Sequence, residues 1–178
     1  PLSLGLHKKG STYDILTASD CKLVHEDMTK ILTCVLEYFR KLGASHYRKM
    51  QHTGYLRHLL VRRAVKTGEI LVALVTSGQT ENLGATEEYT TPVSEQELLA
   101  GWLSCMQALE LEGTFAGILH IRNDTLADVV QSDETRILYG KDYFYEELLG
   151  LKFRISTFSF FQTNTCGAEV LYETAREY

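Results

Sequence analysis

The chain has 178 residues, of which 44% are hydrophobic and 23% are charged, and its 23 acidic and 18 basic side chains give a formal net charge of -5. Two prolines and the lack of any low-complexity stretch exclude a long linker or a disordered chain, and no apolar run is long enough to span a bilayer. A single domain of this length buries roughly 70% of its unfolded surface, which is enough for a hydrophobic core.

The first predicted elements are a hairpin and a long helix. Residues 2–16 form two short apolar runs around Lys9-Gly10-Ser11, a pattern typical of a hairpin. Apolar residues then recur at helical spacing from Val24 to Leu42, and they are followed by Gly43. Because glycine commonly ends helices, we expect one amphipathic helix over this stretch.

A second hairpin is predicted in the middle of the chain. The runs 55–65 and 69–77 are rich in aliphatic and β-branched residues, and they flank the turn Lys66-Thr67-Gly68. The uninterrupted apolar run from Ile70 to Val75 indicates a central strand that is covered on both faces.

The second half is predicted to add one long helix and further strands. Ser94 and Glu97 stand at capping-box spacing before an apolar helical pattern that ends near Gly113. The remaining segments are strands at 115–123, 135–140 and 151–156, with a short helix at Tyr145–Leu149. We therefore expect an α+β fold in which a mainly antiparallel sheet, built from hairpins, has two amphipathic helices packed on one side.

Basic residues are concentrated in one segment. Residues 40–66 contain eight of the lysines and arginines and no Asp or Glu, and His46, His52 and His58 lie among them. Such a segment is suited to contact a polyanion. The alternative is a face that pairs with the protein's own carboxylates, and charge alone does not separate the two.

The four cysteines are Cys21, Cys34, Cys105 and Cys166, and they are scattered without a CxxC pair. This spacing indicates neither a disulfide framework nor a self-contained zinc site, and it favours a reducing, cytoplasmic setting. Cys34 and Cys105 lie among apolar residues of the predicted helices, which favours core packing. No phosphate loop, nucleophile elbow or zinc-protease motif is present.

Three stretches in the same order carry a family resemblance. Residues 153–177, FRISTFSFFQTNTCGAEVLYETARE, resemble the segment that leads into the methyltransferase domain of the RNA (uracil-5-)-methyltransferases. Residues 4–28 are similar to that family's first hairpin with its following cysteine, and residues 54–76 are similar to its arginine-rich central hairpin. One departure is Thr157, where the family usually has proline, and it loosens the backbone before Phe158.

The resemblance implies a division of labour within a longer enzyme. Residues 1–157 would be its central RNA-binding and iron-sulfur-associated domain, and residues 158–178 a linker and first helix leading into an S-adenosylmethionine-binding domain that is not in this chain. In this family a cysteine thiolate adds to C6 of uracil, C5 attacks the methyl sulfonium, and a base removes the C5 proton. Both groups belong to the other domain, so we expect no catalytic residue here and no activity from this chain alone.

Two cofactor contacts follow from the resemblance. Cys21 matches the ligand that many members contribute to a [4Fe-4S] cluster, whose other three ligands lie upstream of this chain. With one ligand, the chain alone is not expected to hold a cluster. Gln162 matches a glutamine of the donor site and would contact S-adenosylmethionine through its amide.

RNA contacts are expected on the arginine-rich hairpin, at Arg57, His58, Arg62 and Arg63. Because strand side chains alternate, Arg57 and Arg63 would share one face and His58 and Arg62 the other, so some of them must be structural. Similarity to the cluster-bearing branch favours ribosomal over transfer RNA. A monomer is expected.

Two alternatives of other classes stay open. The first is an autonomous RNA-binding module, which is disfavoured because both ends of the sequence resemble cuts: it starts at Pro1, and its final helix has hardly begun. The second is a small hydrolase that uses Cys166 or Cys34, for which the sequence offers no base or oxyanion-binding arrangement.

Overall fold

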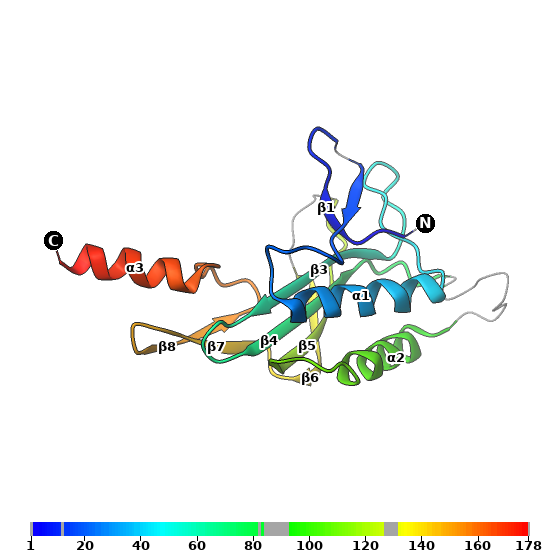
Figure 1. Cartoon of the computed structure of the whole chain (residues 1–178). Coiled ribbons are helices and arrows are strands. Elements are labelled where there is room, and N and C mark those ends of the chain that lie inside the picture. Colours follow the sequence, from blue (N-terminus) through cyan, green and yellow to red (C-terminus); the bar gives the residue numbers. More distant parts are fainter. Residues whose placement is uncertain (1, 12, 82, 84–92, 127–131, 178) are drawn as a thin grey trace.

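The computed structural model describes residues 2–11, 13–81, 83, 93–126 and 132–177 (Figure 1). Within them the element order is β1 (Gly5–His7), β2 (Ile15–Thr17), α1 (Glu26–Lys41), β3 (Leu56–Arg63), β4 (Glu69–Thr76), α2 (Glu95–Gln107), β5 (Thr114–Arg122), β6 (Glu134–Gly140), β7 (Tyr143–Leu148), β8 (Leu151–Ser156) and α3 (Thr165–Arg176). None of the helices in this part of the chain is long and apolar enough to cross a membrane.

The strands form three sheets. A central four-stranded sheet has the order β3-β4-β5-β6, and the hairpins β1–β2 and β7–β8 are separate two-stranded sheets. Pairing in the central sheet is antiparallel except between β4 and β5, which run parallel. The segment that joins these two strands contains α2, as a parallel pair requires a crossover connection. The α+β class is confirmed, and the sheet is mixed.

The start of α2 and the end of α1 lie where the sequence favours them. At the start of α2 the Ser94 hydroxyl accepts from the Glu97 amide, and the Glu97 carboxylate accepts from the Ser94 amide, which completes the predicted capping box. At the end of α1 the basic Arg40 and Lys41 face the negative end of the helix dipole. Gly43 follows with φ of 60°, a left-handed conformation that glycine adopts without strain.

Strand β4 lies between two hydrophobic clusters. Ile70, Val72 and Leu74 pack with α1 and α2 on one face, where Phe39 and Trp102 are fully buried. The alternate residues of β4 pack on the opposite face with Ala64, Leu119, Ile121, Phe144 and Ile155. Figure 1 shows α1 and α2 on the same side of the sheet. The prediction of a central strand covered on both faces is therefore confirmed.

Two predicted elements differ from the structure. Residues 145–149 are not a helix, because Tyr143–Leu148 is strand β7, paired with β8 through a turn at Leu149 and Gly150. Both turn residues have positive φ, 50° and 76°, as the twist of a two-residue hairpin turn requires. The second long helix ends at Gln107, well before Gly113. Beyond the hairpin, α3 projects away from the sheets (Figure 1).

Candidate functional site

The loop that joins β8 to α3 is fixed at its start by Arg62. The Arg62 Nη1 atom lies 2.9 Å from the Ser156 carbonyl oxygen, 3.2 Å from that of Thr157 and 2.7 Å from that of Ser159. Its guanidinium is partly buried, and this burial lowers the pKa of Arg62. The Ser156 and Ser159 hydroxyl oxygens are 2.6 Å apart. Thr157 thus does not leave the turn loose, because a guanidinium holds the carbonyls on both sides of it.

The start of α3 is fixed by a buried carboxylate. Glu146 is 2% exposed, and it accepts hydrogen bonds from the Val65 amide at 2.6 Å, the Lys66 amide at 2.9 Å and the Thr165 hydroxyl at 2.9 Å. Charged acceptors make strong hydrogen bonds of this kind, which offset the cost of burying a carboxylate. The turn between β3 and β4 is thereby tied to the first turn of α3.

Gln162 lies between these two anchors. It is exposed, and among the residues that the structure describes its side-chain amide has no hydrogen-bond partner. The amide therefore does not satisfy backbone groups of its own loop. Apolar side chains along the loop and α3 are exposed as well: Phe158, Phe160, Val170, Leu171 and Tyr172. Exposed apolar residues that gather in one region indicate a surface that another molecule or domain covers.

Arg63, one of the predicted RNA contacts, points to the opposite face of the sheet from Arg62. Its Nε donates to Asp27 Oδ2 at 2.9 Å, and its Nη2 lies 3.2 Å from Glu112 Oε1. Asp27 is 1% exposed. Burial raises the pKa of this carboxyl, but hydrogen bonds from the Glu112 amide, the Arg63 side chain and the Gly113 amide outweigh it, so the net effect lowers the pKa. This pair joins α1 to β3.

Arg57 and His58 lie at an irregular position in the strand. The register of β3 shifts between Leu56 and His58, so the regular alternation assumed for Arg57 is interrupted there. The Arg57 guanidinium lies 4.2 Å from the centroid of the Tyr47 ring, and its Nη1 donates to the Asn123 carbonyl at 2.7 Å. Arg57, Arg62 and Arg63 thus all have intramolecular contacts. The structure does not collect the four residues on one face, and their RNA contacts stay a prediction.

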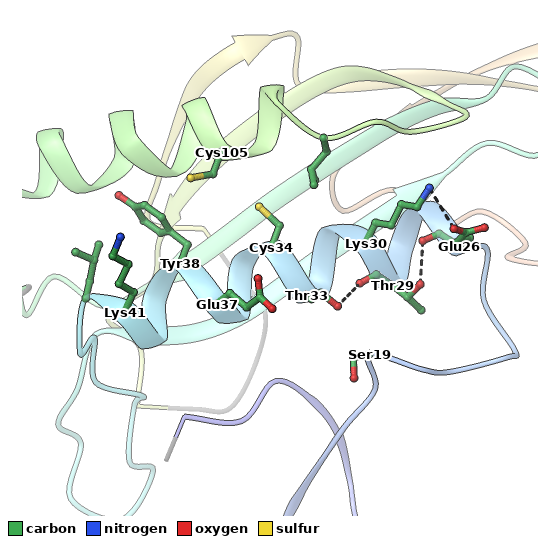
Figure 2. A pocket seen from close by; sticks show the side chains of 12 residues that line it. Ser19, Glu26, Thr29, Lys30, Thr33, Cys34, Glu37, Tyr38, Lys41 and Cys105 are labelled. Carbon is green, nitrogen blue, oxygen red and sulfur yellow. Dashed lines mark hydrogen bonds and ion pairs between the residues drawn. The ribbon is translucent and has the colours of Figure 1, made fainter.

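A groove of about 850 Å³ lies along α1 and α2 (Figure 2). Cys34 of α1 and Cys105 of α2 both line it, and so do Tyr38 and Leu109. The core packing expected for Cys105 is wrong, because this thiol is exposed, whereas Cys34 is partly buried. Burial raises the pKa of Cys34 to about 11. A thiol with so high a pKa is protonated at neutral pH and unreactive, which removes support for a hydrolase that uses Cys34.

The described residues do not form a metal site of their own. They contain no group of three or more His, Cys, Asp and Glu side chains placed to hold an ion. Cys21 is partly buried just after the first hairpin, and Cys166 is exposed in the first turn of α3. Since a [4Fe-4S] cluster takes four ligands, the residues placed here do not fit a cluster, and Cys21 stays a predicted ligand of a longer protein.

Prediction from the sequence did not identify Glu146 or the anchoring role of Arg62. Glu146 occupies an inward position of β7, between Phe144 and Leu148, all three of them buried. A carboxylate in an inward position of an alternating strand pattern is the signal that was available, because such a group is retained only where donors meet it.

No family model matches the chain. A protein named "Uncharacterized RNA methyltransferase" from Clostridium tetani is 47% identical over 178 residues, and the match covers 99% of this chain and 36% of that protein. Proteins with the same description from Clostridium acetobutylicum and Caldanaerobacter subterraneus are 45% and 40% identical, with the same coverage. The chain thus spans 36% of the length of these curated relatives.

One solved structure has a similar fold. It is the Pyrococcus abyssi tRNA (uracil-54, C5)-methyltransferase in complex with S-adenosyl-L-homocysteine, with a TM-score of 0.66 and 21% identity over 93% of this chain and 36% of that one. The likeness supports the arrangement of helices and sheets described above.

Proposed function

This chain belongs to the RNA methyltransferase family of its curated relatives, and on that premise we propose that it is the central segment of an S-adenosylmethionine-dependent enzyme that methylates C5 of uridine. The uridine specificity is supported by the resemblance of residues 153–177 to the RNA (uracil-5-)-methyltransferases. The thiolate nucleophile and the base belong to another part of the longer protein. By itself this chain is inactive.

Gln162 carries the proposal. Its amide is exposed without a hydrogen-bond partner among the residues described, on a loop that Arg62 fixes at one end and Glu146 at the other. An amide both donates and accepts, which suits the amino and carboxylate groups of the donor's methionine moiety. The donor, when bound, supplies the electrophilic methyl group. Gln162 would orient it.

The exposed apolar side chains of α3 support the proposal that the donor-binding domain packs against this helix. Val170 and Leu171 are 65% and 59% exposed, although the helix presents Ala168 and Thr165 to the hairpin on its other side. We assign the exposed side to contact with that domain. The substrate that we prefer is ribosomal RNA, since Cys21 stands where cluster-bearing members have a ligand. We also propose a cytoplasmic location, which the free cysteines among the described residues support, and a monomeric state.

The proposal is tested with the full-length protein that contains this chain. RNA incubated with S-adenosylmethionine should yield 5-methyluridine after digestion and mass spectrometry of the nucleosides. The substrate is total RNA from a strain that lacks the gene. Methylation at another base atom, or no methylation of this RNA, would contradict the proposal.

In the full-length protein, Gln162→Ala should raise the dissociation constant of S-adenosylhomocysteine about tenfold, which corresponds to about 1.4 kcal/mol for a lost hydrogen bond. Isothermal titration measures this, and the melting temperature should change by a few degrees at most. Gln96→Ala, another exposed glutamine at the start of α2, is the matched control and should change neither value. If Gln162→Ala lowered stability and left the affinity unaltered, Gln162 would belong to the fold.

A further inference from the structure

The outward face of hairpin β7–β8 carries two tyrosines that lie under three cations. The Arg154 guanidinium carbon is 3.9 Å from the centroid of the Tyr143 ring, and Lys152 Nζ is 4.4 Å from that of Tyr145. Lys141 Nζ lies 4.8 Å and 5.1 Å from the two centroids, and the rings meet edge to face at 5.6 Å. We call these five residues the cation–tyrosine face.

The hairpin register produces this face. Tyr145 stands opposite Arg154 in the ladder, and Lys152 stands opposite Glu147. Because strand side chains alternate, the residues between them point the other way, and Phe144 and Ile155 pack in the hydrophobic cluster beneath β4 and β5. The core therefore accounts for the inward residues of the hairpin, and packing does not account for the outward ones.

Two of the three cations of this face have no carboxylate partner within the described chain. Lys152 and Arg154 are exposed, and neither forms an ion pair with a carboxylate among the residues that the structure places. Lys141 lies 3.6 Å from Glu69, and Glu147 is the one carboxylate of the two strands on the outward side. This contrasts with Arg63, whose guanidinium is enclosed by carboxylates.

The contacts within the face are weak supports for the fold. A cation over an aromatic ring at an exposed site contributes about 0.5–1 kcal/mol, and ordering a long side chain costs a similar amount. The same groups are the ones that single-stranded nucleic acids require: cations for the phosphates, and ring or guanidinium planes on which bases stack.

We propose that the cation–tyrosine face binds single-stranded RNA, with phosphates on Lys152 and Arg154 and bases stacked on the Tyr143–Tyr145 pair. The inference rests on the proposed function for the choice of RNA over an acidic protein. The inward residue Phe144 lies under the Arg62 guanidinium, 5.5 Å from its carbon. RNA on the outward face would thus be held by the hairpin that also supports the Gln162 loop.

The experiment measures binding of a fluorescent oligouridine of roughly ten nucleotides, within the usual span of a single-strand site, to the 178-residue chain. Lys152→Ala with Arg154→Ala should weaken binding and reduce the slope of log K against log salt by about 1.4, or about 0.7 for each lost phosphate contact. Tyr143→Leu with Tyr145→Leu should weaken binding about tenfold through lost stacking and leave the slope unchanged.

Lys8→Ala with Lys22→Ala removes two exposed cations elsewhere and is the charge-matched control. Thermal melting of each variant shows that it is folded. A slope change equal to that of the control, or unaltered affinity in the tyrosine variant, would overturn the proposal. Equally tight binding of inorganic polyphosphate would show a general polyanion site, and binding of an acidic peptide in place of oligouridine would show a protein-docking surface.

The outcomes are separable from those of the proposed function. Full-length protein that makes 5-methyluridine with the same KM for RNA after the hairpin substitutions would retain the function and refute the RNA-binding face. Salt-dependent oligouridine binding through the face, without 5-methyluridine formation, would do the reverse.

Discussion

The two faces of the central sheet differ in how fully the chain covers them. On the helix face, α1 and α2 enclose Phe39 and Trp102 completely, and the cation Arg63 has its carboxylate partners. On the hairpin face, the loop and α3 leave Phe160 and Leu171 86% and 59% exposed. The chain itself thus buries the core of the helix face more fully than it covers the loop and α3 on the hairpin face. We propose that the latter is a surface for other molecules or domains.

The largest expected effect lies on the helix face. Asp27→Ala leaves Arg63 buried without its closest carboxylate and the Glu112 and Gly113 amides without an acceptor, so the free energy of unfolding should fall by about 3–5 kcal/mol. Urea denaturation measures this. Glu26→Ala, an adjacent exposed carboxylate paired with Lys30 at 3.1 Å, should cost less than about 1 kcal/mol. Similar losses for both would refute the contrast.

The lowered pKa of Asp27 also predicts that the stability of the fold depends on pH. Its folded-state pKa is lowered, so its contribution is complete above the unfolded value of about 3.9 and is lost as pH falls below it toward the folded pKa. Stability measured between neutral and acid pH should therefore decline less steeply in Asp27→Asn than in the parent chain. Equal acid slopes would show that Asp27 is not responsible.

Arg62 should have a smaller effect on stability and an additional effect on the donor site. Arg62→Ala leaves the Ser156 and Ser159 carbonyls without their donor, at a cost of about 1–3 kcal/mol. Because it positions the loop and does not touch the donor, it should also weaken S-adenosylhomocysteine binding by the full-length protein. Arg62→Lys keeps the charge but removes the guanidinium plane, whose carbon lies 5.5 Å from the centroid of the Phe144 ring, and it should restore only part of this affinity. Full affinity in Arg62→Ala would place the anchoring of the loop elsewhere.

The smallest effect is expected on α3. Leu171→Ser should change the free energy of unfolding of the 178-residue chain by less than about 0.5 kcal/mol, whereas the buried Leu98→Ala on the helix face should cost about 2–5 kcal/mol. In the full-length protein Leu171→Ser should lower the melting temperature. If it did not, the assignment of the α3 surface to a neighbouring domain would be wrong.

Most of the fold could be predicted from local sequence patterns. The capping box at Ser94, the turn at residues 66–68 and the apolar run of β4 each specify an element through neighbours in sequence, and the structure has all three. The family resemblance is confirmed by the relatives. The prediction of a helix where β7 lies was wrong for two reasons. Glu146, Glu147 and Leu148 favour helices by intrinsic propensity. The backbone donors that allow Glu146 to occupy an inward strand position lie 80 and 81 residues away in the sequence.

The candidate site was less accessible from sequence than the fold. A count of charges located the basic segment but could not show that Arg63 pairs with Asp27, 36 residues earlier, or that Arg62 meets carbonyl oxygens nearly a hundred residues later. Such partners are fixed by the tertiary arrangement. The parallel pairing of β4 with β5 was missed for the same reason.

The adjacent arginines of β3 also constrain how its hairpin with β4 can pair. Arg62 and Arg63 stand opposite Leu71 and Ile70 in the ladder, and they satisfy different chemistry on opposite faces, carbonyl oxygens on one and carboxylates on the other. A slip of one residue would turn each side chain to the wrong face. Arg63 would then enter the cluster around Phe144, and Asp27 would lose its partner. The pair therefore selects one register among several that the aliphatic residues alone would tolerate.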